Sequence, residues 1–255
     1  MKNNRHPETS QSHFSKRAPG YDTSSHWVGD RNLISKMRRA ARPGRNSLLL
    51  DLAVGTGMIA AAFKGRVKKV VGLDLCAGMS LKSRRKVDCL VLSRAEKLPF
   101  PDNTFDICSC RQGLQFMDLH KVLAEISRVL KPGGRAVFCH LTSYGGKDDK
   151  TSFLIQRFRN PARKNFFSPG DLASISRRHF PRARTSEHIT RESVRNWISN
   201  GAISESSKSR IIAIYKSSPA SFIKTHEVVF RNGDVFDSMR MEIVTVFKKR
   251  KTGEK

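Results

Sequence analysis

A glycine-containing turn and an acidic residue further along the chain could together hold a nucleoside. The turn is Asp51-Leu52-Ala53-Val54-Gly55-Thr56-Gly57, between an apolar run and an alanine-rich stretch with helical spacing. Glycine lets the backbone approach a ligand closely, and the N–H groups of the following helix then face that ligand. Asp74 ends the next apolar run and can accept hydrogen bonds from the hydroxyls of a ribose. Tight strand–helix turns need glycine anyway, so the nucleoside hypothesis depends on Asp74.

The elements that must position these residues alternate between strand and helix. Continuous apolar runs predict buried parallel strands at 48–53, 70–73, 88–93, 105–110 and 135–141. Helical spacing predicts helices at 21–41, 55–63, 77–83 and 119–130. Lys131-Pro132-Gly133-Gly134 ends the last of these helices. Repeated strand–helix–strand units predict a parallel sheet with helices on both faces.

Residues 142–255 have a different pattern, in which short helices precede a hairpin. Ser168-Pro169 is typical of an N-cap followed by the first helical position, and predicts a helix that reaches about Arg178. Two further helices are expected at 192–198 and 206–216. Strands are expected at 227–230 and 239–247, around the turn Asn232-Gly233-Asp234.

Four ordered segments resemble a known family: DLAVGTG, VGLDLCAGM, RAEKLPFPDNTFD and ISRVLKPGGRAVF. They are similar to class I S-adenosylmethionine-dependent methyltransferases, in the small-molecule branch that includes ubiquinone/menaquinone-biosynthesis methyltransferases. HFSKRAPGYD resembles the N-terminal segment of that branch, and CRQGLQFM resembles the stretch after its fourth strand. The resemblance covers about residues 13–141. It implies an α/β fold with a doubly wound, Rossmann-like, mostly parallel seven-stranded sheet, an antiparallel C-terminal strand and a helical lid.

The resemblance also implies a cofactor, S-adenosyl-L-methionine, with S-adenosyl-L-homocysteine as its product. Asp51 would lie near the methionine amino group, while Ala53, Gly55 and Gly57 would pass beneath the methionine and ribose. The remaining implied contacts are Asp74 with the ribose hydroxyls, Leu75 and Met79 beside the adenine, Ala95 and Glu96 at the adenine ring, and Arg111 and Gln112 where the sulfonium and the acceptor meet.

One position departs from the family pattern. Arg94 stands where the family usually has an aspartate that accepts a hydrogen bond from the adenine amino group. Arginine has five donors and no acceptor, so it cannot take that role. Either the loop shifts or another acceptor, such as Glu96, replaces the aspartate.

Methyl transfer needs alignment of the two reactants and, for a hydroxyl or carbon acceptor, a base. His140 is the best candidate base, because it follows the fifth strand, but it could equally be a polar residue that closes a strand. Tyr21 could reach the site if the N-terminal helix folds over it, and could otherwise be a packing residue. His179, His188 and His226 have no metal-ligand partners at useful spacing, so no metal site is expected.

The boundaries follow from these motifs. Residues 1–20 are expected to form a flexible arm, 21–45 an N-terminal helical cap, 46–141 the S-adenosylmethionine-binding core, and 142–255 a substrate and lid region that completes the sheet. The first 30 residues lack the apolar core of a signal peptide, and no apolar run reaches the roughly 18 residues of a membrane helix. We therefore expect a cytoplasmic protein without a membrane span. Its oligomeric state is left open.

The chain of 255 residues carries 48 Lys plus Arg against 22 Asp plus Glu, a net charge of +26. The excess is spread along the chain, at +7 over 1–45, +7 over 46–140 and +12 over 141–255, whereas dedicated nucleic-acid proteins more often concentrate it. Cys108 and Cys110 lack the Pro-Cys context of a cytosine methyltransferase, and CRQG replaces the Asn/Asp-Pro-Pro-aromatic box of amino-directed enzymes. Both absences argue against modification of nucleic-acid bases, and the two cysteines are expected in the core.

The acceptor is expected to be a small, aromatic or anionic molecule, with O-methylation favoured over C- or N-methylation. The alternative is RNA or an acidic carrier protein, held by the basic surface. Residues 157–184 hold eight basic side chains with phenylalanines between them, which suits either an anionic partner or an amphipathic helix that buries its phenylalanines. A third hypothesis is a module that binds S-adenosylmethionine without catalysis.

Overall fold

A computed structural model describes residues 9–199 and 202–250. Its centre is one sheet with the strand order β3-β2-β1-β4-β5-β8-β6. The first five strands along the chain are β1 (Leu48–Leu52), β2 (Lys69–Asp74), β3 (Cys89–Leu92), β4 (Phe105–Arg111) and β5 (Leu130–Thr142). They are mutually parallel, and chain order reverses between β1 and β4. The order of strands is therefore that of a doubly wound sheet.

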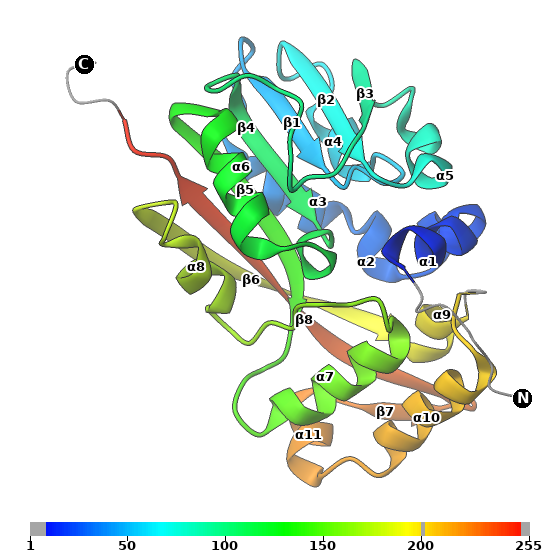
Figure 1. Cartoon of the computed structure of the whole chain (residues 1–255). Coiled ribbons are helices and arrows are strands. Elements are labelled where there is room, and N and C mark those ends of the chain that lie inside the picture. The colour runs from blue at the N-terminus through cyan, green and yellow to red at the C-terminus, as the bar shows by residue number, and fades with distance from the viewer. Residues whose placement is uncertain (1–8, 200–201, 251–255) are drawn as a thin grey trace, which may run out of the picture.

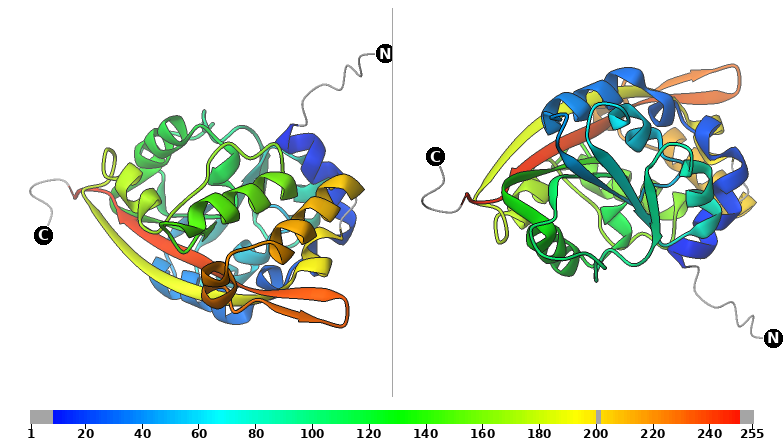
Figure 2. Two further views of the ribbon diagram at one scale, coloured as in Figure 1. Left: turned by 90° about the horizontal axis from the view of Figure 1, so that it is seen from below. Right: turned by 90° about the horizontal axis from the view of Figure 1, so that it is seen from above.

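The C-terminal part completes this sheet with one antiparallel strand, β8 (Asp234–Phe247). On its other side β8 pairs with β6 (Arg182–Ser193), and Figure 2 shows the two long strands side by side. A short strand, β7 (Val229–Arg231), pairs with the start of β8 through the expected hairpin turn and adds an eighth strand to the seven that were predicted. The predicted fold class, a mostly parallel sheet with an antiparallel C-terminal strand, is confirmed.

Helices cover both faces of the sheet (Figure 1). One face packs against α3 (Arg31–Ala41) and α4 (Met58–Phe63), and the other against α6 (Leu119–Val129) and α8 (Asp171–Ser176). Each helix buries an apolar stripe, such as Leu33, Met37 and Ala41 on α3. Cys108 and Cys110 are buried in the core, as the sequence predicted.

The remaining helices lie around the carboxyl ends of the parallel strands. Near the N-terminus they are α1 (Ser10–Arg17), the 3₁₀ helix η1 (Ala18–Thr23) and α2 (His26–Gly29). Short helices α5 (Ala77–Ser80), η2 (Leu81–Ser83) and η3 (Leu114–Phe116) follow β2 and β4. In the C-terminal part, α7 (Asp148–Arg159), α9 (Val194–Ile198), α10 (Glu205–Lys216) and α11 (Ala220–Thr225) form a second group. Figure 1 shows this group next to the hairpin of β7 and β8.

Four expectations about local structure are wrong. Residues 10–20 are not an unstructured arm but form α1 and the start of η1, with Thr9 as the N-cap; residues 1–8 lie outside the described residues. The helix expected over 21–41 is divided, because the Asp30 side chain caps α3 by accepting from the amides of Asn32 and Leu33.

The other two errors lie in the C-terminal part. The helix expected from Ser168 begins at Asp171, capped by Gly170 in the left-handed region. Strand β6 was not predicted at all, because Arg182–Ser193 is mostly polar and solvent-exposed. Its strand conformation comes from pairing with β8 rather than from an apolar run. Within the described ranges, no helix is long and apolar enough to cross a membrane.

Candidate active site

The turn between β1 and α4 has an unusual backbone. Ala53, Gly55 and Gly57 all have positive φ, at 52°, 52° and 77°. This left-handed region is open to glycine but strained for other residues. Ala53 is therefore strained, at a position where the resembled family often has glycine. Three left-handed residues within five positions turn the chain sharply between β1 and α4.

Asp74 joins this turn to the neighbouring strand. It ends β2, next to β1, and its Oδ2 accepts a hydrogen bond from the backbone N–H of Gly55 at 2.8 Å. Its Oδ1 accepts from the N–H of Cys76, also at 2.8 Å. Burial raises the pKa of Asp74, although these backbone bonds oppose the effect. Each carboxylate oxygen keeps a further lone pair, so Asp74 can still accept hydrogen bonds from a ligand.

A cavity of about 450 Å³ opens at the carboxyl ends of β1, β2 and β4. Its volume lies within the range of small-molecule sites, and its position is where doubly wound sheets bind ligands. Nine of the eleven residues predicted to contact the cofactor line it: Ala53, Gly55, Asp74, Leu75, Met79, Ala95, Glu96, Arg111 and Gln112. Residues from four separate segments of the sequence therefore meet around one cavity.

The other two predicted contacts, Asp51 and Gly57, do not line the cavity. Asp51 is buried beneath the turn, where its Oδ1 accepts from Ser109 Oγ at 2.7 Å. Burial raises the pKa of Asp51 to about 7, against the opposing charge of Arg111. Gly57 instead serves as the N-cap of α4.

Helix α1 covers the cavity, a position that was not predicted from the sequence. Thr9, Ser10, Gln11 and Phe14 line the cavity from above. Gln11 Nε2 donates to the carbonyl of Leu75 at 3.3 Å, and Phe14 contacts Phe116 edge to face at 5.1 Å. Figure 1 shows α1 beside α5. The resemblance of HFSKRAPGYD to the family's N-terminal segment was the signal that could have placed this helix over the site.

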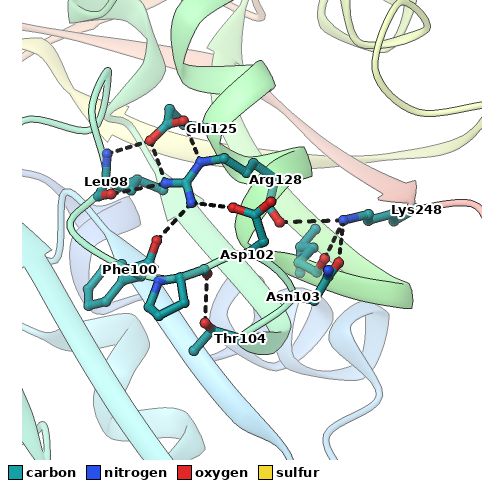
Figure 3. Close-up of polar contacts among 10 residues, drawn as sticks. Leu98, Phe100, Asp102, Asn103, Thr104, Glu125, Arg128 and Lys248 are labelled. Carbon is teal, nitrogen blue, oxygen red and sulfur yellow. Dashed lines mark hydrogen bonds and ion pairs between the residues drawn. The ribbon is translucent and has the colours of Figure 1, made fainter.

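One wall of the cavity is the loop between β3 and β4, which is held by Arg128 of α6. Figure 3 shows the guanidinium of Arg128 between Glu125 and Asp102. It also donates to the carbonyls of Leu98 at 3.0 Å and Phe100 at 2.8 Å. The loop is therefore fixed from behind, on the side away from the cavity.

Arg94 lies at the cavity end of this loop. Its side chain is 63% exposed, and its Nε lies 3.8 Å from Glu96 Oε2. Glu96 Oε1 accepts from the backbone N–H of Asp118 at 3.3 Å. Both residues line the cavity, and of the two only Glu96 offers acceptor oxygens there.

The structure does not support His140 as a base. Its side chain is 1% exposed and does not line the cavity. Nδ1 donates to Gln115 Oε1 at 2.9 Å, and the ring lies 5.5 Å from that of Phe167. Burial and the charge of Arg163 lower the pKa of His140 to about 3. A group this buried and this weakly basic is poorly suited to accept a proton from an acceptor.

Tyr21, the second candidate for catalysis, lies in the cavity wall. Its ring meets those of Phe14 and Trp27 edge to face, each at 6.4 Å between centroids. Arg111, at the end of β4, connects α2 to the sheet, because its guanidinium donates to the carbonyls of Trp27 and Val28 at 3.1 Å. Tyr21 thus combines a packing role with a place at the site, the two alternatives that the sequence left open.

The basic stretch 157–184 does not form one surface. Phe167 and Phe180 are buried in the core, as expected of an amphipathic segment. Arg182 and Arg184 lie over Phe247, which pairs with Arg135 near the amino end of β4, whereas the cavity lies at the carboxyl ends of the strands. Arg159 and Arg163 instead lie near the cavity, in a pocket described below. Among the described residues no three His, Cys, Asp or Glu side chains are grouped to hold a metal ion.

Comparison with known proteins identifies the core of this architecture. Residues 50–138 match the methyltransferase domain family. Over these residues, from β1 into β5, the chain is therefore similar to methyltransferase domains. It is 38% identical over 110 residues to the demethylmenaquinone methyltransferase of Corynebacterium kroppenstedtii, covering 43% of this chain and 47% of that protein.

Two further proteins extend the comparison. The malonyl-[acyl-carrier protein] O-methyltransferase of Serratia marcescens is 35% identical over 136 residues, covering 51% of each chain. This chain therefore spans about half the length of the two curated relatives. The crystal structure of the YcgJ protein from Bacillus subtilis has a TM-score of 0.78 at 21% identity, covering 85% of this chain and 98% of that one. At that identity the likeness shows a shared fold.

Proposed function

We propose that the chain binds S-adenosylmethionine in the 450 Å³ cavity and transfers its methyl group to a small aromatic or anionic acceptor. The observation that carries the proposal is Asp74, whose carboxylate lies in the cavity wall and is bonded to the amide of Gly55. A glycine turn and a strand-end carboxylate in contact form the arrangement that holds a nucleoside at the switch point of a doubly wound sheet.

The residues present fit this cofactor. Asp74 keeps free lone pairs for two ribose hydroxyls, and the left-handed turn leaves room for a ligand against its backbone. Leu75 and Met79 supply apolar surface for a flat ring, and Glu96 supplies the acceptor that Arg94 lacks. Asp51 would act from beneath the turn, where a cationic amino group nearby would favour its ionised form.

We assign the three parts of the chain accordingly. Residues 46–141 bind the cofactor, residues 21–45 form a helical cap, and residues 142–255 complete the sheet and contact the acceptor. The helix α1, within the first 20 residues, is added to the lid because it lines the cavity from above. Its contacts with α5 would keep water from the reacting atoms.

When bound, S-adenosylmethionine would supply an electrophilic methyl group for in-line displacement by the acceptor, with S-adenosylhomocysteine as the leaving group. The protein's part is to align the two reactants. Asp74 and the turn would hold the cofactor, while Arg111 and Gln112, which also line the cavity, would face the acceptor. Because His140 does not line the cavity and Tyr21 does, Tyr21 carries the hydroxyl best placed to hydrogen-bond the acceptor. We favour O-methylation, since a hydroxyl acceptor can form that bond directly.

The proposal is tested by calorimetric titration of S-adenosylhomocysteine into the wild type and into Asp74→Ala and Asp74→Asn. Losing hydrogen bonds to a charged group costs about 1.5–3 kcal/mol, so we expect roughly 10- to 100-fold weaker binding. Glu205→Gln, on an 85% exposed side chain far along the chain, is the matched control. Circular dichroism shows whether each variant is folded. Unchanged affinity in a folded Asp74→Ala would refute the cofactor assignment.

A macromolecular acceptor is the second candidate, favoured by the exposed Arg177, Arg178, Arg182 and Arg184. Arg182 and Arg184 lie toward the amino ends of the parallel strands, away from the cavity, so an RNA or acidic carrier held there would have to reach around the molecule. A binding titration at increasing salt separates the two candidates, because a polyanion is released steeply as salt rises. No binding at low salt excludes the second candidate.

A further inference from the structure

Three arginines converge on a second, smaller pocket beside the cofactor cavity. Arg17 ends α1, Arg159 ends α7, and Arg163 follows in the next loop. All three line a pocket of about 50 Å³. This pocket shares four lining residues with the cofactor cavity: Phe14, Tyr21, Gln112 and Phe116. The two spaces are therefore neighbours, divided by the lid and by the end of β4.

The charges of these arginines are not balanced within the protein. Arg17 is 6% exposed and Arg159 5% exposed. Over residues 9–199 and 202–250, none of the three forms an ion pair with a carboxylate, and Nε of Arg17, Nε of Arg159 and Nη2 of Arg163 lack any acceptor. Burial, with the charges of Arg17 and Arg163, holds the pKa of Arg159 well below its usual range. Buried charges are normally paired, so this cluster lacks its counter-ion.

A carboxylate that acts on this cluster is already engaged in other hydrogen bonds. Glu192 acts on Arg159 electrostatically, but its two oxygens accept from the backbone N–H groups of His26 and Trp27, at 3.0 and 2.8 Å. Among the described residues, the side-chain acceptor bonded to Arg17 is the hydroxyl of Ser24, at 3.4 Å. Neither group can neutralise three guanidinium ions.

Aromatic rings orient the guanidinium groups. Arg159 lies over the ring of Trp197 at 5.1 Å, and Arg17 lies over Phe14 at 5.4 Å and Tyr21 at 5.0 Å. Stacking of this kind occupies the faces of a guanidinium and leaves its N–H edges available. Those edges form the planar forks that bind carboxylate and phosphate oxygens in pairs.

We propose that this arginine pocket binds an oxyanion of the methyl acceptor, a carboxylate or a phosphate group, with Arg159 and Arg17 as its main ligands. The inference rests on the proposed function, since it names the acceptor class for that site. The pocket holds the volume of only a few water molecules, so it takes the charged end of the acceptor. The rest of the acceptor extends past Tyr21 and Gln112 into the cofactor cavity.

The experiment measures binding of inorganic phosphate and of acetate by calorimetry, with S-adenosylhomocysteine at saturation. At least one anion should bind the wild type, and the better probe tells which oxyanion the acceptor carries. Arg159→Met and Arg17→Met should each weaken that binding at least tenfold. Arg157 is an exposed arginine on α7, two positions before Arg159, and Arg157→Met should leave anion binding unchanged.

A second readout separates a binding role from a structural one. An unpaired buried charge destabilises the free protein, so Arg159→Met should unfold at a higher temperature than the wild type when no anion is present. Phosphate or acetate should then raise the unfolding temperature of the wild type but not that of the variant. A lower unfolding temperature for Arg159→Met would mean that the arginine is satisfied within the fold, and would overturn the proposal.

Two further results would also overturn it. One is the absence of anion binding to the wild type. The other is competition between the anion and S-adenosylhomocysteine, since the arginines would then hold the carboxylate of the cofactor rather than that of an acceptor. Failure of S-adenosylhomocysteine itself to bind the wild type would instead refute the proposed function, and anion binding measured without it would still report on the pocket.

Discussion

Replacing Arg128 by methionine should loosen the wall of the cofactor cavity without touching the cavity itself. Methionine keeps the length and the apolar stem of the side chain but removes every donor. The guanidinium donates to two loop carbonyls, those of Leu98 and Phe100, and to the carboxylates of Glu125 and Asp102 (Figure 3). Glu125 in turn accepts from the N–H of Leu98 at 2.6 Å, so the loss would spread through the loop.

The cost can be worked out from these contacts. Each of the two partly buried hydrogen bonds from the charged donor to a carbonyl contributes about 1.5 kcal/mol at the low end, which gives about 3 kcal/mol for both. Asp102 is 67% exposed, so its ion pair adds little. Such contributions are not additive, and we expect a loss of about 3 kcal/mol in the free energy of unfolding.

Urea denaturation followed by circular dichroism measures this loss, and calorimetry measures the affinity for S-adenosylhomocysteine. Both should fall in Arg128→Met, since the loop carries Arg94, Ala95 and Glu96 to the cavity. Lys121→Met on the same helix, where the lysine is 70% exposed, should stay within about 0.5 kcal/mol of the wild type. If Arg128→Met loses less than about 1 kcal/mol, Arg128 does not anchor the loop.

Two other predictions concern stability. Burial lowers the pKa of His226, but hydrogen bonds to Asp148 and Asp237 outweigh it and raise the pKa to about 9 from 6.5. The protonated His226 should therefore contribute about 3 kcal/mol at most to the free energy of unfolding. This contribution should be present below pH 6.5 and be lost as the pH rises through about 9. Urea unfolding across this range measures the loss, and an equally steep fall in stability in His226→Gln would contradict the prediction. Gly57→Ala would place a Cβ 2.8 Å from η2 at a φ of +77° and should cost about 2–4 kcal/mol. Gly65→Ala, at a φ of +75° with open space around it, should cost only about 1 kcal/mol, and equal losses in thermal unfolding would show that the clash is relieved.

Much of the core could be predicted because its signals are local. The apolar runs at β1, β2 and β4 and the helical spacing of α6 follow from burial on both faces of a sheet. The turn from Ala53 to Gly57 was identifiable because few residues adopt left-handed φ. Asp74 was identifiable because it ends a strand beside that turn. Nine of the eleven predicted cofactor contacts line one cavity for this reason.

Other parts could not be predicted because their signals are not local. β6 is a polar segment that becomes a strand only by pairing with β8, so its sequence carries no alternating pattern. His140 was correctly expected at the end of a strand, but the packing of Phe167 and Gln115 around it decides that it is buried. Its low basicity follows from that burial and was not visible in the sequence.

The sequence by itself determined alternating strands and helices with a glycine turn and a strand-end carboxylate, because apolar runs, helical spacing and turn geometry depend on residues close together in the chain. Only the tertiary structure decided that α1 roofs the cavity, that Tyr21 lies in its wall, and that Arg17 meets Arg159 across 142 positions. Burial and charge are properties of all the neighbours in space. The net charge therefore could not show that part of the excess is buried, without a counter-ion, beside the site.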